Sequence, residues 1–304
     1  MEKKSFYLCN KHKVFALVYV MSFLTFITSC SDDDSEGFNS GKERLVTGWS
    51  SQVGSPVSIR YDEMKRPTKI GSIAIYYNFK PEDLGYIDDG SYEEIKGKNF
   101  YFSGSWSFNL FEISKQGYIT NILDDVWLES INGGSERILH VNGDSTTYSY
   151  NKAGYLTDIK RYVFDSEHKK RKMVNHCILE WSNGNLVHYY TADGMFETNF
   201  GYGNELNKSQ IYPIYVDGVD RGFSYDDYHP LMSSSFMEFA NAGLLGKVSK
   251  NLVKTKAWNN QGYYSSDRST NSYEYELDES GYVISYIVTN ERTNKTSKVF
   301  FTYN

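Results

Sequence analysis

The chain has 304 residues, a formal net charge of −6 and an isoelectric point near 5.6. An acidic chain lacks the basic surface that nucleic-acid binding requires, so we expect no nucleic-acid partner. Aromatic residues make up 16% of the chain, with 27 Tyr and 18 Phe against 5 Pro, and this composition favours β-strands over helices.

The N-terminus has the pattern of an export signal. Four lysines lie within the first 13 residues, and an uncharged apolar run from Val14 to Ile27 follows them. This run is shorter than the ~20 residues that a membrane-spanning helix needs, so we expect cleavage and not a retained transmembrane anchor. We therefore assign residues 1–30 to a signal peptide.

The signal peptide ends in Ile27-Thr28-Ser29-Cys30, which resembles the lipobox of bacterial lipoproteins. In that motif the cysteine thiol is acylated and the cysteine becomes the new N-terminus; the commonest form has Leu first and Gly or Ala before the Cys. Several acyl chains, at ~0.8 kcal/mol per buried CH₂, hold a domain firmly on a membrane. We predict that Cys30 carries the lipid and attaches the protein to the outer membrane.

Residues 31–45 follow Cys30 as an acidic flexible tether. They begin Ser-Asp-Asp-Asp-Ser-Glu and show no apolar periodicity, and like charges keep such a segment extended. An acidic run directly after the lipidated cysteine resembles the signal that sends Bacteroidetes lipoproteins to the outer face of the outer membrane. We expect the domain to face the cell exterior, with the periplasmic face as the alternative. Cys177 is then the one cysteine left for disulfide chemistry, so no intramolecular disulfide is expected.

A hairpin pattern recurs through residues 46–304. In Tyr150–Ile159, YNKAGYLTDI, apolar residues alternate before a glycine, and an apolar residue follows it at a fixed distance. This spacing describes a β-hairpin with one face toward a core, and glycine reaches the positive φ that a tight turn needs. A fifth, degenerate copy, IRYDEMKRPTKI, has Lys65 at the glycine position. The turn glycines of the four clear copies are Gly117, Gly154, Gly184 and Gly281.

These hairpins predict an all-β fold. An isolated hairpin is marginally stable, so the copies must share a continuous antiparallel sheet. We predict one elongated domain built from β-hairpin repeats, with at most one short helix, at Phe236–Leu245. The pattern leaves the strand order open, because an open sheet, a curled half-barrel and two packed sheets all satisfy it.

The repeat resembles a known module. The pattern Tyr-x-x-x-Gly-Tyr-Leu is similar to the YD repeats of RHS and teneurin proteins. The stretches YDEMKRPTKI and YEYELDESGYV resemble a weaker version found in Bacteroidetes lipoproteins classed as a domain of unknown function (4595). The resemblance implies an all-β sheet of hairpins, and it carries no established activity, cofactor or functional residue.

Motifs for catalysis and metal binding are weak in this sequence. Asp226–Pro230, DDYHP, places two carboxylates beside a histidine, but no second cluster has ligand spacing. The sequence lacks a Gly-x-Ser-x-Gly nucleophile motif, and Gly243–Ser249 is too short between its glycines to form a phosphate-binding loop. We expect no cofactor, no metal site and no catalytic residues; an unrecognised enzyme is the third alternative.

Four aromatic residues are candidates for ligand binding, because carbohydrate recognition relies on exposed flat rings. Trp127 shares a predicted strand face with acidic residues, and Trp258, Tyr263 and Tyr264 lie in the polar run KTKAWNNQGYYSSDRS. A packed position at the rim of the sheet is the alternative for each, and the one that the pattern favours. We therefore predict a non-catalytic binding module for a glycan or another extended polymer.

The alternative is a structural or assembly component of the outer membrane that docks a partner protein through a sheet edge or a flat face. The basic run His168–Lys172, HKKRK, lies between two apolar segments. It suits either contact with an anionic polymer or a charged hairpin tip that blocks edge pairing.

Overall fold

The computed structural model describes residues 44–51, 56–78, 98–103, 107–131, 136–140, 144–165, 167–168, 170–212, 239–261 and 267–304. For 102–103, 107–108, 125–131, 136–140, 260 and 267 it describes the backbone alone. Within the described ranges, no helix is both long and apolar enough to cross a membrane.

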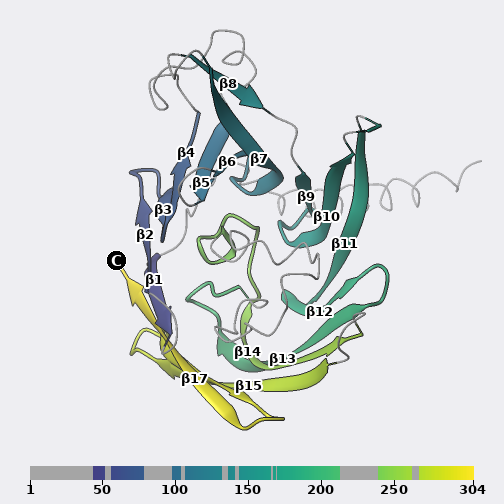
Figure 1. The fold of residues 1–304 in the computed structure, drawn as a ribbon. Helices are drawn as coiled ribbons and strands as arrows, with labels where there is room; N and C mark the ends of the chain where they lie inside the picture. The colour runs from purple at the N-terminus through teal and green to yellow at the C-terminus, as the bar shows by residue number, and fades with distance from the viewer. Residues whose placement is uncertain are drawn as a thin grey trace, which may run out of the picture. The chain divides into compact units, whose positions relative to one another are not determined.

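Seventeen antiparallel strands lie in the described part of the chain, and sixteen of them close into a barrel (Figure 1). The strands are β1 (Val46–Ser51), β2 (Val57–Tyr61), β3 (Pro67–Ile70), β4 (Ile73–Tyr76), β5 (Asn99–Ser103), β6 (Ser107–Ile113), β7 (Ile119–Ile131), β8 (Glu136–His140), β9 (Ser145–Tyr150), β10 (Leu156–Asp165), β11 (Lys170–Ser182), β12 (Asn185–Thr191), β13 (Phe196–Leu206), β14 (Asn251–Asn260), β15 (Asp267–Leu277), β16 (Val283–Asn290) and β17 (Lys295–Tyr303).

Each strand of the barrel pairs with its neighbours along the chain, with one exception. β7 pairs with β9 through Asn121–Leu123. β8 pairs with the end of β7, at Trp127–Ile131, and is not one of the strands that close the ring. The pairing of β17 with β1 closes the barrel. The predicted all-β antiparallel fold is thereby confirmed, but the sheet closes on itself, an arrangement that the sequence pattern did not distinguish.

Strand alternation gives the barrel an apolar inside. Side chains facing inward, such as those of Ile70, Ile119, Leu156 and Ile159, have no exposed surface and belong to one hydrophobic core. Because successive residues of a strand point to opposite faces, the residues between them face outward.

The outward positions are mostly polar. Lys298 donates to Glu276 over 3.3 Å on this face. Three apolar residues of β16 and β17, Ile284, Ile287 and Phe300, are each 37–40% exposed. Exposed outward positions of other strands carry Arg60, Lys69, Glu112, Glu180, Asn199 and Glu274. The wall is therefore apolar within and largely polar outside.

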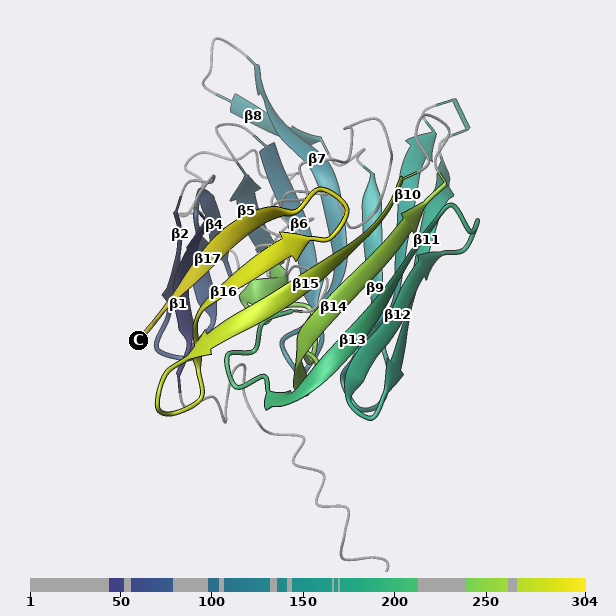
Figure 2. The same cartoon turned by 90° about the horizontal axis from the view of Figure 1, so that it is seen from below.

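Successive connections of an antiparallel barrel alternate between its two ends. One end, here the turn end, carries the five repeat turns, Arg44 and the C-terminal Asn304. The other end, here the loop end, carries the connections β10–β11, β12–β13, β14–β15 and β16–β17 (Figure 2, turn end at the bottom). All copies of the repeat therefore build the same end of the molecule.

Three repeat turns share one geometry, those at Gly117, Gly154 and Gly281. Their glycines have φ of 83–85° and donate the amide to the carbonyl three residues earlier. The residue at that earlier position is Ser, Asn or Asp, and its side chain accepts the amide of the residue after the glycine. In the second turn, for example, the Tyr155 amide donates to Asn151 Oδ1 over 3.1 Å. This arrangement is the three-residue hairpin loop, in which a left-handed residue closes the turn with a bulge.

Lys65 occupies the glycine position of the degenerate copy, as the alignment predicts. Its φ is 60°, its amide donates to Asp62 O over 2.9 Å, and Asp62 Oδ1 accepts the Arg66 amide over 2.8 Å. The left-handed conformation costs a residue with a side chain about 1–2 kcal/mol. The turn therefore keeps the shared geometry at an energetic cost.

The turn at Gly184 differs from the others. Asn183 and Gly184 have φ of 51° and 79°, and Ser182 pairs directly with Asn185. Two consecutive residues of positive φ between paired strands form a type I′ turn, for which Asn-Gly is the preferred sequence. The aligned copies therefore share a glycine but not one turn type.

An aromatic side chain ties each hairpin to its neighbour at the turn end; we call this contact the aromatic clamp. The ring's polar group donates to the carbonyl of the residue two positions after the turn glycine, or after Lys65 in the degenerate copy. Tyr150 Oη donates to Ile119 O over 2.6 Å, and Trp181 Nε1 to Leu156 O over 2.7 Å. The same contact joins Tyr77 to Pro67, Tyr202 to Leu186 and Tyr303 to Val283.

The clamp hydroxyls remain donors near neutral pH. Burial raises the pKa of Tyr303 to about 12, and burial raises the pKa of Tyr150 well above its ordinary value. The protonated hydroxyl is the form that can donate to a carbonyl. The clamps therefore hold across the physiological pH range.

The connection from β13 to β14 lines the turn end from inside. Its described parts, residues 207–212 and 239–250, are here called the inner segment, and Figure 1 shows the latter part in green within the ring of strands. Lys247 N donates to Gly154 O over 2.8 Å. Further bonds join Leu244 to Ile119, Lys250 to Gly184, Ser249 to Leu186 and Ser209 to Val283.

The helix expected at Phe236–Leu245 ends earlier than predicted, and residues 236–238 lie outside the described ranges. Residues 239–241 are helical, and Gly243 then takes a φ of 81°. The Gly243 and Leu244 amides donate back to Ala240 O and Phe239 O and so cap the helix, and the residues that follow find backbone partners in the repeat turns. The loop of residues 85–97 lies outside the described ranges.

Candidate functional site

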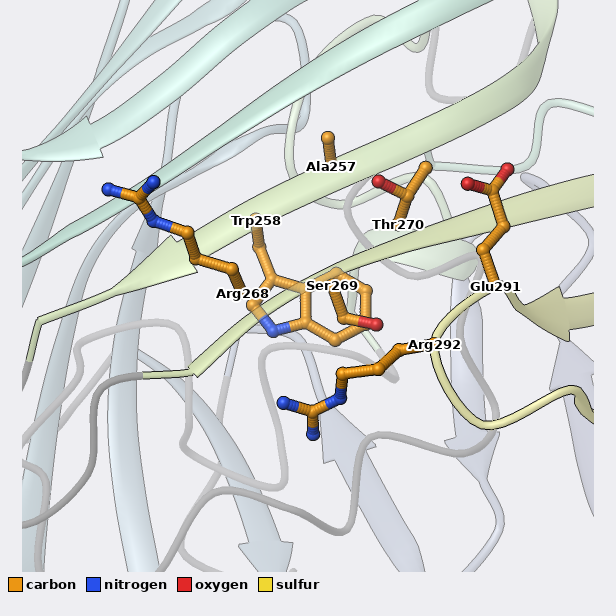
Figure 3. Close-up of a pocket in the computed structure, with 7 residues that line it drawn as sticks. All are labelled: Ala257, Trp258, Arg268, Ser269, Thr270, Glu291 and Arg292. Carbon is orange, nitrogen blue, oxygen red and sulfur yellow. The ribbon is translucent and has the colours of Figure 1, made fainter.

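A hollow of about 450 Å³ lies at the loop end of the barrel (Figure 3). Three elements build it: the end of β14, the start of β15, and the turn that follows β16. Its lining residues are Ala257, Trp258, Arg268, Ser269, Thr270, Glu291 and Arg292.

The sheet register explains which side chains share a side of the hollow. Trp258 pairs directly with Ser269, and Ala257 with Thr270, and residues directly opposite each other point to the same face. Figure 3 shows the Trp258 indole and the Ser269 hydroxyl on one side of the strands, with Arg292 beyond them. That side is the inner face, because Trp258 belongs to the hydrophobic core.

Arg268 is held in place by two further side chains. Its Nε donates to Asn259 Oδ1 over 2.9 Å, and Asn259 Nδ2 donates to Glu197 Oε1 over 3.0 Å. The Glu291 amide donates to Thr270 O over 2.8 Å, which fixes the turn carrying Arg292 against β15. These bonds hold the two arginine-bearing segments at the rim of one hollow.

A polar row continues from the hollow along the inner face. Lys256 is buried, 5% exposed, and its Nζ lies 5.9 Å from the centre of the Trp258 ring. Asn290 Nδ2 donates to Ser269 Oγ over 2.8 Å and to Asn271 Oδ1 over 3.1 Å. The inner wall at this end therefore carries several polar side chains beside the apolar rings of Trp258 and Phe200.

Trp258 is only 8% exposed, so it takes the packed rim position and not that of a freely exposed ring. Alternation puts it on the inner face, where its register partners Thr198 and Ser269 lie beside it. It lines the hollow as part of the wall instead of standing free. Trp127 lies in β7 opposite His140, but its side chain, Tyr263 and Tyr264 lie outside what the structure describes.

Sequence reasoning did not identify Arg268, Arg292 and Lys256. One signal for Lys256 was available, since the alternation in Lys-Ala-Trp places it on the face of Trp258. The two arginines lie in segments far apart along the chain, which only the pairing of β15 with β16 brings together.

Groups for chemistry are sparse within the described residues. No group of three or more His, Cys, Asp or Glu side chains there is placed to hold a metal ion. Cys177 is fully buried, and burial raises the pKa of its thiol, so it packs as a small apolar side chain. The motif at Asp226–Pro230 lies outside the described ranges.

Solved structures share this fold. No family model and no curated protein matches the sequence. A porin-like protein from Bacteroides vulgatus matches with a TM-score of 0.52 and 13% identity, over 86% of this chain and 99% of that one. A porin-like protein from Bacteroides uniformis matches with a TM-score of 0.52 and 14% identity, over 85% and 98%. Identities this low show the barrel fold alone.

Proposed function

We propose that the protein is a non-catalytic binding module of the cell envelope, anchored in the outer membrane by a lipid on Cys30. Its ligand is a glycan or another extended polymer, bound at the loop end of the barrel. The hollow beside Trp258 carries this proposal. It offers guanidinium, carboxylate and hydroxyl groups at the rim of a rigid sheet, as recognition of a ligand rich in hydroxyl groups requires.

The path of the chain supports this arrangement. Arg44 donates to Asp278 over 2.6 Å in the Gly281 turn, and the Leu45 amide donates to Asn304 Oδ1 over 2.9 Å. The chain therefore enters the barrel at the turn end. With the tether attached at the turn end, the hollow lies at the opposite end of the barrel, where a ligand can reach it.

The polar outer wall favours a tethered binding module and argues against a membrane-spanning pore. A lipid-facing barrel wall is apolar outside, and a Lys or Arg near the bilayer midplane costs about 2–4 kcal/mol. Outward residues here include Arg60, Lys69 and Lys298, while most of the buried apolar side chains belong to the inner core. We infer that this barrel stands in water beside the membrane and does not cross it.

This inference is tested by removing the lipid site. A Cys30→Ala chain should leave the membrane fraction and stay monomeric without detergent, whereas the wild type should partition into Triton X-114. A Cys30→Ala chain that still needs detergent would contradict both the lipid anchor and the water-facing wall. Protease treatment of intact cells then reports the side: cleavage before lysis indicates the exterior, and protection indicates the periplasmic face.

The binding proposal is tested with the rim arginines. Affinity electrophoresis through gels containing a panel of neutral and anionic polysaccharides should show retardation in at least one gel. Replacing Arg268 and Arg292 together by Ala should weaken that retardation about tenfold or more, since each offers charge-assisted hydrogen bonds. The Arg60→Ala variant, which changes the outer face of β2, is the matched control. Migration unaffected by every polymer in the panel would count against a glycan ligand.

The second candidate function is docking of a partner protein, favoured by the outer part of the β10–β11 hairpin. All of Lys170–Val174 is exposed, including Met173 at 48% and Val174 at 45%. Among the described strands, pairing with β12 begins at Cys177 and pairing with β9 ends at Tyr162. The tip therefore offers two strand edges, although its lysines are the side chains that commonly block edge pairing.

A photocrosslinker at Met173 tests this alternative. Cross-linking in cells should trap one stoichiometric envelope protein, and the same probe at the outward-facing Asn199 of β13 should not. Recovery of no partner from the Met173 position would remove the docking function.

A further inference from the structure

We propose that the turn end of the barrel lies on the surface of the membrane that carries the anchor, and that lysine and tyrosine side chains at this end bind the phosphate groups of anionic lipid headgroups. This inference rests on the proposed lipid anchor and adds the orientation of the barrel at the membrane. It gives the end that carries the repeat turns a role in binding as well as in folding.

Two lysines of the inner segment lie beside two of the repeat turns. Lys247 N donates to Gly154 O over 2.8 Å. Lys250 N donates to Gly184 O over the same distance. Both lysine side chains are exposed, so the backbone is fixed against the turns while the ammonium groups reach the water beyond them.

A tyrosine ring accompanies each of these lysines. A Cβ built on Gly154 would lie 3.4 Å from Tyr118 Cε2 and 3.6 Å from Lys247 Cε. The same construction on Gly184 gives 3.3 Å to Tyr155 Oη. Both rings are half-buried, and a half-buried tyrosine beside a lysine suits a membrane–water interface, because each side chain has an apolar body and a polar tip. We call these four side chains the Lys–Tyr row: Tyr118, Lys247, Tyr155 and Lys250.

The row is basic, although the chain as a whole is acidic. Two further exposed lysines, Lys115 and Lys152, lie in the turns at Gly117 and Gly154. The turn sequences SKQGY, NKAGY and SNGN and the inner segment KVSK contain no acidic residue. Among the described residues, none of the four lysines has an ion-pair partner. The positive charge of this end is therefore available to an anion from outside the chain.

The position of the tether identifies the membrane as the source of that anion. Arg44 follows the tether of residues 31–45 almost to its end and bonds to Asp278 at the turn end, the end at which the row lies (Figure 2, bottom). The attraction of a lysine to an anionic surface falls off over about 8 Å at physiological salt. A lipid anchor at this end keeps the row close to the headgroups, where each lysine strengthens the contact about fivefold.

The loop end carries a basic segment too, and it serves as the comparison. Lys170 and Lys172 in the β10–β11 hairpin are exposed, but Asp165 and Glu167 lie in the same hairpin tip. This tip is at the end of the barrel opposite to the tether. An upright barrel therefore brings the Lys–Tyr row to the membrane and keeps the hairpin tip away from it.

The test measures lysine acetylation in the lipidated wild-type protein bound to preformed vesicles. One set of vesicles is phosphatidylcholine alone, and the other contains an equal part of phosphatidylglycerol; mass spectrometry follows the rate at each lysine. Lys247 and Lys250 should react at least about fivefold more slowly on the phosphatidylglycerol vesicles, and about 0.5 M salt should remove the difference. Lys170 and Lys172 should react equally fast on both.

Two double variants separate the row from the total charge. Lys247→Gln with Lys250→Gln should abolish the slower acetylation of Lys152, which reports on the same end. Lys170→Gln with Lys172→Gln removes the same charge and should leave the rate at Lys152 as in the wild type. All of these side chains are exposed, so neither variant should change the melting temperature by more than about 1 °C.

The outcomes distinguish this inference from the anchor on which it rests. A protein that binds both kinds of vesicle with equal rates at the row would overturn the inference and leave the anchor intact. Slower acetylation of the hairpin tip would overturn it as well, because the opposite end would then meet the membrane. Slower acetylation of the row in cells but not on phosphatidylglycerol vesicles would overturn lipid binding in favour of an acidic partner protein. Binding to neither kind of vesicle would overturn the anchor and this inference with it.

Discussion

The two ends of the barrel are built on different principles. At the turn end, one local motif is repeated five times, and its backbone groups are satisfied by aromatic clamps and by the inner segment. At the loop end, the described connections differ from one another, and a hollow, a polar inner row and a projecting hairpin lie there. The end with the repeated turns therefore stabilises the fold, and the end with dissimilar connections is the one for which we propose ligand binding. The predictions below test this division.

The largest effect is expected where the inner segment meets a repeat turn. Gly246 has φ of 85°, and a Cβ there would lie 2.7 Å from Gly154 O and 2.8 Å from the Tyr150 ring. Gly246→Ala should therefore lower the free energy of unfolding by about 3 kcal/mol, as the sum of backbone and steric costs. Urea unfolding measures this loss.

The loop end supplies the control for that substitution. Gly194 has φ of 74°, but nothing lies within 4 Å of a Cβ built there. Gly194→Ala should lower the free energy of unfolding only by the cost of placing alanine in the left-handed backbone conformation, about 1 kcal/mol. Equal losses for the two variants would show that the inner segment is not packed against the repeat turn, and the division between the ends would fail.

The next effect concerns the aromatic clamp. Tyr150→Phe removes the 2.6 Å bond to Ile119 O while keeping the ring, so it should lower the free energy of unfolding by about 1–2 kcal/mol. Tyr190→Phe is the comparison, because its hydroxyl meets Glu180 at 3.4 Å on the outer face; we expect less than about 0.5 kcal/mol there. A clamp variant as stable as Tyr190→Phe would contradict a structural role for the clamp.

Lys65 offers a stabilising prediction. Its φ of 60° suits glycine, so Lys65→Gly should raise the free energy of unfolding by about 0.5–1 kcal/mol, after the entropy that glycine adds to the unfolded chain. Glu63→Gly in the same turn should have the opposite sign, since among described residues Glu63 is not one of those with positive φ. A destabilised Lys65→Gly protein would mean that contacts of the lysine side chain outweigh its backbone cost.

Local features of this fold were predictable because they are encoded within a few residues. The turns at Gly117, Gly154 and Gly281, and the lysine that stands for a glycine at position 65, are each fixed by φ and by short-range bonds. Closure into a barrel was not predictable, because it depends on the pairing of β1 with β17, the first and last strands of the domain. No local pattern encodes a contact between segments so distant in sequence.

The candidate site shows the same limit. Trp258 was identifiable as an aromatic in a polar run, but its exposure depends on the strands on either side. Thr198 and Ser269 flank it, and they come from strands whose partners the sequence did not specify. Arg268 likewise gains its position from Asn259 and Glu197. Sequence periodicity shows which residues share a face, but not which strand lies beside them.

The smallest effect tests the turn end through pH. Hydrogen bonds from the Tyr282 and Ser280 amides and the Arg44 guanidinium hold the pKa of Asp278 below its ordinary value. A carboxylate with a lowered folded pKa contributes stability above its unfolded pKa, near 4, and loses it as the pH falls through the folded pKa.

Wild type should therefore lose stability between about pH 5 and pH 3 relative to Asp278→Asn. At pH 7 the wild type should be slightly the more stable, because Asn keeps an amide acceptor, as Asn151 does in the β9–β10 hairpin, but lacks the charge that pairs with Arg44. Urea unfolding across this pH range gives the comparison, and parallel curves for the two proteins would show that the Asp278 charge contributes nothing to the turn. Because Arg44 lies just before β1 and pairs with Asp278, a measurable difference would also show that the start of the barrel is held by the repeat turn.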